Sequence, residues 1–188
     1  MTDFRFTGAG HVAEGKLLVA RNLEFKAKVG DLPALEGLFK ENGAVFIEDL
    51  NQMDVYFCVP KGRLKYREIL GHRSELIFYE RDENSSASMQ SNYDILCIDD
   101  SSLKDFLVKA LGVKVVVQKK RRLLKLKNGR IHLDRVESLG QFLEFEVVSE
   151  GDDAGDVKLL DRLKKLAQPF VTQEINASYS DLMLLENY

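Results

Sequence analysis

The sequence predicts an α+β fold in which strands with one apolar and one ionic face are joined by a few helices. Residues 21–30 (RNLEFKAKVG) alternate apolar and charged side chains, and similar alternation returns in several later stretches. Because successive strand side chains point to opposite faces, this pattern indicates strands with one apolar and one charged face. Between these stretches, capping residues and glycines mark helix starts and stops.

The helices follow from their end signals. In DLPALEGLFKENG, Asp31 is the predicted N-cap and Gly43 the stop. Ser102 with Asp105 resembles a capping box, and Gly112 closes that helix. A third helix is predicted over 156–167, and Ser180 is predicted to cap a short fourth one. The predicted strands are 22–29, 44–59, 62–70, 75–81, 92–99, 114–126, 129–135 and 141–149, with a polar, mobile loop over 82–92.

Composition bounds the function. The chain has 188 residues, of which 45% are hydrophobic, so it can bury one full core. One domain is predicted over 21–188, preceded by a flexible extension over 1–20. The net charge of −3 argues against a nucleic-acid partner. No apolar run approaches the roughly 18 residues of a membrane helix, so a cytoplasmic protein is expected. Cys58 and Cys97 fit a reducing compartment, as small apolar fillers.

The charged faces sort by sign. One strand carries Arg63, Lys65 and Arg67 on one face, and another carries Lys119 and Arg121. By contrast, GQFLEFEVV places Glu144 and Glu146 together on one face. Cationic strands side by side repel one another unless an anion lies among them. A polyphosphate held by the cations and a divalent metal held by the carboxylates would satisfy both sets, whereas solvent-facing strands remain the alternative.

Seven stretches together resemble the CYTH family, also called the triphosphate tunnel metalloenzymes. They are NLEFKAKV, QMDVYF, GRLKYRE, LIFYER, KKRRLL, RIHLDRVESLGQFLEFEV and SYSDLM, in the family's order and spacing. The resemblance runs from about residue 21 to the end of the sequence. The QxDxYF stretch, with Gln52, Asp54, Tyr56 and Phe57, is most similar to the branch that contains the class IV adenylyl cyclases of the CyaB type.

The resemblance implies an eight-stranded antiparallel β-barrel that forms a tunnel, with helices packed outside. It assigns the triphosphate-binding positions to Lys26, Lys28, Arg63, Lys65, Arg67, Arg81, Lys119 and Arg121. It assigns Mg²⁺ or Mn²⁺ binding to Glu24, Asp134, Glu144 and Glu146, and catalysis to the three glutamates. The charged face of residues 22–29 is therefore expected to point inward.

Two departures from the family pattern concern the site. Asn22 stands where the family's ExExK begins with Glu, and Ala177 stands in place of the arginine of a C-terminal RSY. Other residues have alternative interpretations. Asp54 is expected to orient a cation rather than bind metal, and His132 is expected to be a satisfied strand histidine rather than a proton shuttle. Lys120 and Arg122 are expected to face solvent, and a nucleic-acid patch in KKRR is disfavoured.

The resemblance implies an enzyme that acts on a triphosphate compound such as ATP. A class IV adenylyl cyclase, making cAMP and pyrophosphate, is the first hypothesis. A triphosphatase acting on inorganic, thiamine or nucleoside triphosphate is the second, and a non-catalytic polyphosphate- or nucleotide-binding module is the third. No membrane partner is expected, and a homodimer is suggested by the resemblance alone.

Overall fold

The computed structural model describes residues 22–81, 91–100, 102–149 and 153–186. Its elements are β1 (Asn22–Val29), α1 (Leu32–Glu41), β2 (Val45–Phe57), β3 (Arg63–Ile69), β4 (Ser74–Arg81), β5 (Ser91–Ile98), α2 (Ser102–Leu111), β6 (Val113–Leu126), β7 (Gly129–Val136), β8 (Gly140–Val148), α3 (Asp153–Ala167), β9 (Val171–Glu174) and α4 (Tyr179–Glu186). A short 3₁₀ turn over Gln168–Phe170 joins α3 to β9. The predicted loop over 82–92 lies mostly outside the described residues, and 91–92 belong to β5.

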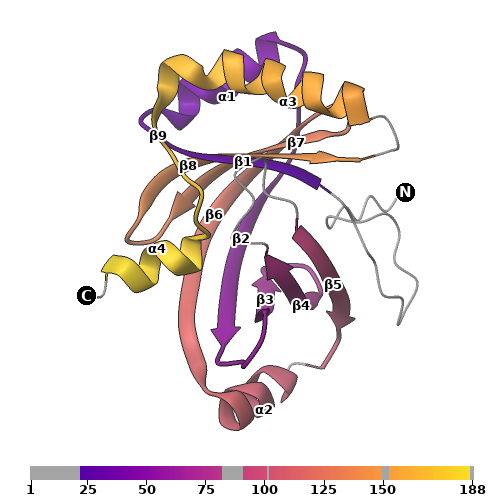
Figure 1. The fold of residues 1–188 in the computed structure, drawn as a ribbon, viewed down its shortest axis with the longest axis vertical. Helices are drawn as coiled ribbons and strands as arrows, with labels where there is room; N and C mark the ends of the chain where they lie inside the picture. Colours follow the sequence, from indigo (N-terminus) through magenta and orange to yellow (C-terminus); the bar gives the residue numbers. More distant parts are fainter. Residues whose placement is uncertain (1–21, 82–90, 101, 150–152, 187–188) are drawn as a thin grey trace.

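The strands form one antiparallel sheet in the order β5-β4-β3-β2-β6-β7-β8-β1-β9 (Figure 1). The predicted α+β architecture and all eight predicted strands are confirmed. The sheet has nine strands, however, because the four residues of β9 pair with β1. Among the described residues, no pairing joins the edge strands β5 and β9, so the sheet is not closed by hydrogen bonds.

The outer face of the sheet is covered by α1 and α3, which lie over β1, β7 and β8 (Figure 1). The core beneath them collects Leu35 and Phe39 from α1, Leu163 from α3, and the alternate apolar residues of the strands, Phe25, Ala27, Val29, Ile131, Leu143, Phe145 and Val147. Burying this apolar face determines which side of each strand points inward. The expected orientation of β1, with its apolar face toward the helices, is confirmed.

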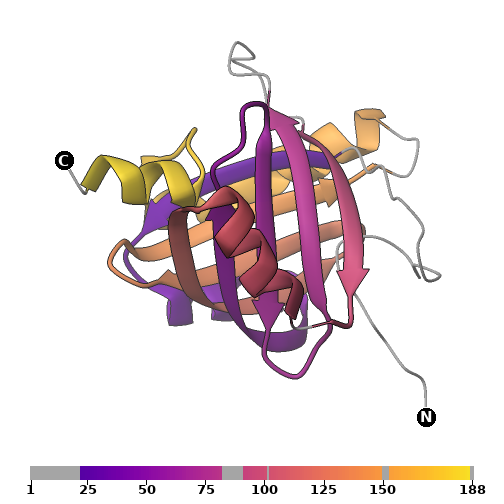
Figure 2. The same cartoon turned by 90° about the horizontal axis from the view of Figure 1, so that it is seen from below.

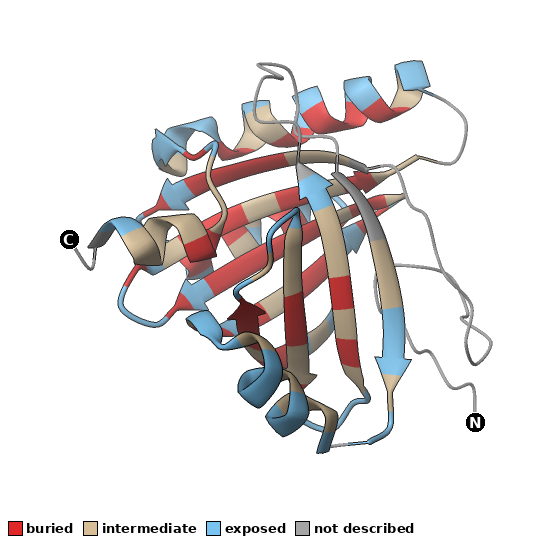
Figure 3. Ribbon diagram, turned by 60° about the horizontal axis from the view of Figure 1, so that its bottom comes forward, coloured by how far each residue is buried: buried red, intermediate tan, exposed pale blue. Residues whose placement is uncertain are grey.

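A smaller cluster lies between the sheet and α2, which crosses β2 and β3 when the molecule is seen from below (Figure 2). Phe57 and Tyr66 are its buried aromatic residues, and Leu103 and Leu107 of α2 pack on them. No residue of α2 is fully buried, whereas α3 buries one complete stripe (Figure 3). Cys58 and Cys97 are free and exposed, so the prediction that they fill the core is wrong.

The helix ends confirm some predicted caps and correct others. The Asp31 side chain accepts the backbone N–H of Ala34 at 3.0 Å, and Gly43 ends that turn with a φ of +93°. Ser102 already lies inside α2, and Asp100 accepts its N–H at 2.8 Å.

The cap of α4 is Ser178 rather than Ser180. Ser178 Oγ accepts the N–H of Asp181 at 3.2 Å, while the Asp181 carboxylate accepts the N–H of Ser178 at 3.0 Å. This reciprocal pair is a capping box. Ser180 lies within the helix. Within the described ranges, no helix combines the length and the hydropathy needed to cross a membrane.

Candidate functional site

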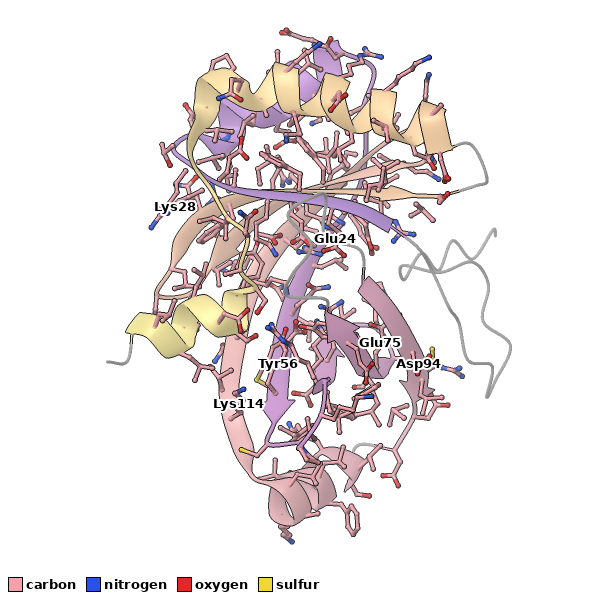
Figure 4. The ribbon with its side chains drawn as sticks, in the orientation of Figure 1. Glu24, Lys28, Tyr56, Glu75, Asp94 and Lys114 are labelled. Atoms are coloured by element: carbon pink, nitrogen blue, oxygen red, sulfur yellow. The ribbon has the colours of Figure 1, made fainter. Side chains whose placement is uncertain are left out.

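A cavity of about 200 Å³ lies against the inner face of the sheet. Every strand from β1 to β8 contributes to its wall, as does α4, through residues that include Glu24, Gln52, Lys65, Glu75, Ile95, Lys119, Arg130, Glu144 and Tyr179. In Figure 4, Glu24 lies beside β1 and Glu75 lies among β3–β5, so the two residues belong to different walls. The sheet therefore curls around a charged interior.

Three cations converge on a single carboxylate at one side of the cavity. Asp54 accepts bonds from Arg67 Nε at 2.7 Å and Arg67 Nη2 at 2.9 Å. The same Oδ2 atom accepts Lys65 Nζ and Lys119 Nζ, each at 3.2 Å. Lys65, Arg67 and Lys119 around Asp54 are called the cation cluster below. The prediction that Asp54 orients a cation is confirmed, and this cluster carries more positive than negative charge.

The environment of the cation cluster lowers the pKa of Lys119. Burial lowers the pKa of Lys119 because the charged form loses its water, and the neighbouring Arg67 and Arg121 lower it further. Asp54 opposes these effects, yet the pKa of Lys119 still falls to about 7. The pKa of Asp54 lies well below its usual value, because its three cations outweigh the effect of burial. An anion that enters the cavity would therefore be attracted to this cluster.

Glu24, Glu144 and Glu146 lie on another side of the cavity, on the adjacent strands β1 and β8, and are called the carboxylate wall. Glu24 stands opposite Glu146 in the strand register, and Lys26 stands opposite Glu144. Burial would raise the pKa of Glu144, but Lys26 and Arg121 outweigh it and leave the pKa well below its usual value. The pKa of Glu146 is lowered as well, since Arg130 Nη1 lies 3.0 Å from its carboxylate and outweighs burial.

Asp134 connects the two sides from behind the cavity. It is completely buried and is not among the residues that line the cavity. Its two oxygens accept bonds from Arg121 Nε at 2.8 Å and Arg121 Nη2 at 2.6 Å. The Tyr179 hydroxyl donates a third bond at 2.8 Å. Arg121 Nη2 also reaches Glu144 at 3.0 Å, so Asp134 holds both Arg121 and Tyr179 in place.

Two of the residues assigned to triphosphate binding, Lys28 and Arg63, do not line the cavity in this arrangement. Lys28 is exposed, with its Nζ 5.9 Å from the centre of the Phe142 ring. Arg63 Nη1 donates to Ser178 Oγ at 2.8 Å and to Asp181 at 2.9 Å, so it fastens the capping box of α4 to β3. Arg81 ends β4, and its side chain lies outside the described residues.

The other predicted site residues meet at the cavity: Glu24, Lys26, Lys65, Arg67, Lys119, Arg121, Glu144 and Glu146. Lys120 and Arg122 lie on the opposite face of β6, as expected. Arg122 is not simply solvated, because it bonds Asp49 at 2.8 Å and Glu36 at 2.6 Å.

Several cavity residues were not predicted to belong to the site. Tyr56 and Tyr79 line it near Lys65, and Tyr179 reaches it from α4, with its ring 4.6 Å from Lys26 Nζ. Gln52 Oε1, Glu75 Oε1 and His132 Nδ1 are buried atoms of lining residues that have no hydrogen-bond partner. The signal for Glu75 was present, since it shares the odd-numbered face of β4 with Tyr79 and Arg81.

The chain matches known proteins in fold and family. The PH1012 protein of Pyrococcus horikoshii OT3 is 24% identical with a TM-score of 0.70, covering 86% of this chain and 98% of that one. A candidate adenylate cyclase of Vibrio parahaemolyticus is 20% identical with a TM-score of 0.67, covering 87% and 98%. HpAC1 of Hippeastrum, a candidate adenylyl cyclase described as having a dominant triphosphatase activity, is 15% identical with a TM-score of 0.61, covering 88% and 96%.

At these identities the solved structures establish the fold alone. No curated protein matches the chain in sequence. The model of the CYTH domain family, however, matches residues 20–176, which is most of the chain. The motifs that suggested the family therefore agree with the fold and with the family model, and the chain belongs to the CYTH domain family.

Proposed function

We propose that this chain is a metal-dependent enzyme that acts on a triphosphate compound held in the cavity, and that its activity is most similar to that of a class IV adenylyl cyclase. The observation that carries the proposal is the cation cluster, in which two buried lysines and the half-buried Arg67 share Asp54. Buried charges are costly unless they are paired. A polyphosphate would supply the missing negative charge.

The cavity residues divide the work of holding such a ligand. Arg67 and Arg121 have planar guanidinium groups that suit phosphate oxygens, and Lys26, Lys65 and Lys119 act as compact charges. Asp54 and Asp134 hold the two arginines through paired bonds, which keeps their orientation before the ligand arrives. Preorganised cations of this kind stabilise charge that grows on a departing phosphate or pyrophosphate. Because β1–β8 all line the cavity, we propose that it is the interior of a tunnel.

The carboxylate wall is the proposed metal site. Within the described ranges, no group of three or more His, Cys, Asp or Glu side chains is already arranged to hold an ion. The donor chemistry nevertheless fits Mg²⁺ or Mn²⁺, because Glu144 and Glu146 stay ionised and these ions prefer oxygen ligands. Glu24, Glu144 and Glu146 would hold the ion. When bound, it would polarise a phosphate and lower the pKa of the attacking hydroxyl or water.

We propose a different role for Asp134 than direct metal binding. Its oxygens already accept three bonds from Arg121 and Tyr179, and none of its surface is exposed. It would instead position Arg121 for the phosphates. Arg63 would likewise position α4 and Tyr179, and Lys28 would act only near the entrance. The proposed triphosphate-binding residues are therefore Lys26, Lys65, Arg67, Lys119 and Arg121.

Two reactions suit this arrangement. In the cyclase reaction, the ribose 3′-oxygen bonds to the α-phosphorus, its proton leaves, and pyrophosphate departs. In the triphosphatase reaction, water bonds to the terminal phosphorus and loses a proton, the bond from that phosphorus to the bridging oxygen breaks, and the diphosphate departs. The QxDxYF stretch favours the first, and the likeness in fold to HpAC1 of Hippeastrum keeps the second close behind. The reactions differ in where the nucleophile sits along the same bound phosphates.

Product analysis tests the proposal. The purified chain is incubated with ATP and Mg²⁺ or Mn²⁺ beside the Glu144→Ala/Glu146→Ala double variant. We expect cAMP and pyrophosphate from the native chain and loss of both in the variant. ADP and phosphate instead would identify a triphosphatase, with inorganic and thiamine triphosphate as the next substrates. Bound ATP without any product, or the same products from the double variant, would contradict the proposed catalysis.

The Asn22→Glu variant separates weakened catalysis from a pure binding module. It restores the carboxylate that the family pattern has at this position. A gain in turnover and in metal affinity is expected if Asn22 limits catalysis. No turnover in either chain, with ATP bound equally by both, would favour the binding module.

A further inference from the structure

Glu75 is a buried carboxyl group for which the proposed reaction has no use. It lies on β4, lines the cavity, and is only 3% exposed. Among the described residues, its Oε1 atom has no hydrogen-bond partner, although a buried polar atom of this kind normally has one. Its other oxygen lies 3.9 Å from Arg67 Nη1, which is a long ion pair. Glu75 therefore keeps one unused acceptor in the wall of the cavity.

The surroundings of Glu75 differ from those of the cation cluster. Ile77 is two residues further along the same face of β4, and Ile95 stands opposite Ile77 on β5. Ile69 extends the apolar surface on β3, beyond Arg67, which stands opposite Glu75. All three isoleucines line the cavity. This wall, made of Glu75, Ile69, Ile77 and Ile95, is called the Glu75 wall, and it offers flat apolar surface around one acceptor.

The chemistry of the Glu75 wall excludes phosphate as its ligand. A carboxylate oxygen repels phosphate oxygens, and isoleucine side chains cannot donate hydrogen bonds. The wall suits an apolar, planar group that carries an N–H donor. Since the wall adjoins Arg67 of the cation cluster, such a group would belong to a ligand whose phosphates extend away toward Lys119.

We infer that the Glu75 wall is the head-group subsite of this enzyme, and that Glu75 selects a heteroaromatic ring bearing an amino group, an inference that rests on the proposed function. The amino group would donate to Glu75 Oε1, and the ring would pack on Ile77 and Ile95. Adenine and the aminopyrimidine of thiamine share this chemistry. Rings with an oxygen in place of the amino group would place two acceptors face to face.

The electrostatic setting of Glu75 agrees with this role. Burial raises the pKa of Glu75, although Arg67 and Lys65 act in the opposite direction. A carboxyl group accepts a hydrogen bond from an amino group in either protonation state. A glutamine at this position would accept the same bond, whereas a methionine of similar length would not.

Paired ligands test the inference without relying on turnover. Calorimetric titrations in EDTA measure the affinity of the full chain for ATP against inosine triphosphate, and for thiamine triphosphate against oxythiamine triphosphate. Within each pair, an oxygen replaces the amino group. Inorganic triphosphate reports on the phosphate grip alone. Glu75→Gln and Glu75→Met are compared with Glu48→Gln, a matched control because Glu48 also lines the cavity but already has His72 as a partner at 3.3 Å.

We expect the native chain to prefer the amino member of one pair by about ten- to hundredfold, the range for leaving a buried acceptor unpaired. The pair that shows the preference identifies the ring. Glu75→Met should remove most of it by weakening the amino member. Glu75→Gln should keep the affinity for the amino member but strengthen the oxo member, because its amide also donates. Glu48→Gln should leave the preference unchanged. Affinity for inorganic triphosphate should be similar in all four chains.

Two outcomes would overturn the inference while leaving the proposed function intact. One is equal affinity for both members of each pair when inorganic triphosphate binds. The other is a preference that survives Glu75→Met. If no triphosphate compound binds at all, the proposed function fails first, and the subsite fails with it.

Discussion

The two sides of the cavity pair their charges differently, although both are built from buried or half-buried Lys, Arg, Asp and Glu side chains. In the cation cluster, Lys65, Arg67 and Lys119 share one carboxylate, Asp54. On the other side, the carboxylate wall is matched by Lys26, Arg121 and Arg130, and Arg121 is also bonded to Asp134. Among the described residues, Glu144, Glu146 and Asp134 thus each have a cation partner.

The difference teaches how one cavity can offer two kinds of electrostatic surface. A fully matched set of ion pairs would be a structural network, because every charge would already be satisfied. The cation cluster departs from such a match because its three cations share Asp54, whereas Glu144 and Glu146 each have a cation partner. The predictions below disturb one side at a time, in order of expected effect.

Asp54→Ala should have the largest effect on stability. It removes the carboxylate shared by the three cations of the cluster, and uncompensated buried charge typically costs about 3–5 kcal/mol. Urea unfolding of the native and variant chains measures the loss in the free energy of unfolding. Inorganic triphosphate should restore more stability to the variant than to the native chain. Equal stabilisation of both chains would contradict an excess of positive charge in this cluster.

His132 lines the cavity, and its charge state can be measured through the pH dependence of stability. Burial, followed by Arg121, lowers the pKa of His132 to about 4 from its usual value of 6.5. The unfolded chain therefore binds a proton below pH 6.5 that the folded chain rejects until about pH 4, so stability falls as the pH falls through this window. The loss is at most about 3 kcal/mol, from 1.36 kcal/mol per pKa unit. His132→Asn should flatten this part of a stability–pH curve, and an unchanged slope would refute a neutral His132.

Glu144→Ala tests whether Glu144 stabilises the fold or destabilises it through repulsion from the neighbouring glutamates. If repulsion among the glutamates dominated, removing Glu144 would stabilise the fold. Its lowered pKa indicates the reverse, because Lys26 and Arg121 stabilise the ionised form. We expect a loss of about 2 kcal/mol at pH 7, the scale of a hydrogen bond to a charged group. The deficit should shrink as the pH falls below the usual range of a glutamate, since the protonated native side chain loses the same contacts.

The smallest and most specific effect is expected at Lys119. This residue should take up a proton when a triphosphate binds. At pH 8 the Lys119 amine is mostly neutral in the free protein, because its pKa is about 7. A bound triphosphate raises that pKa, so the complex should gain up to about one proton. Calorimetry in two buffers with different ionisation enthalpies measures the uptake. Lys119→Met should abolish it, and uptake by that variant would assign the proton to another group.

Alternation was enough to place the residues of these two sides. Lys26 points inward because Phe25 and Ala27, on the other face of β1, pack beneath α1 and α3, and a slip of one residue would expose that core. Lys119 shares the buried face of β6 with Val117 and Arg121, and the polar residues beside it are exposed. Sequence spacing did not reveal the roles of Arg63 and Asp134. Both depend on α4, which lies far along the chain and presents Ser178 and Tyr179.

Glu75 and β9 were missed for different reasons. Glu75 lies at the start of β4, away from the cationic strands that drew attention in the sequence, and its importance lies in what surrounds it in space. Strand β9 has four residues, VTQE, with no alternation long enough to detect, and it forms because β1 offers an open edge. The family resemblance suggested a closed barrel of eight strands, whereas β9 occupies the edge beside β1.

The capping box of α4 relates the order in which the chain is synthesised to the completion of the cavity. All nine strands precede Ser178 and Tyr179 in the chain, so a ribosome exposes the whole sheet before it exposes the segment that Arg63 fastens. A nascent chain that stops at residue 175 would carry the cations and the glutamates but lack the Tyr179 hydroxyl that bonds Asp134. The wall of the cavity is thus completed by α4, which follows all nine strands in the chain, and until α4 docks the polar lining stays open to water.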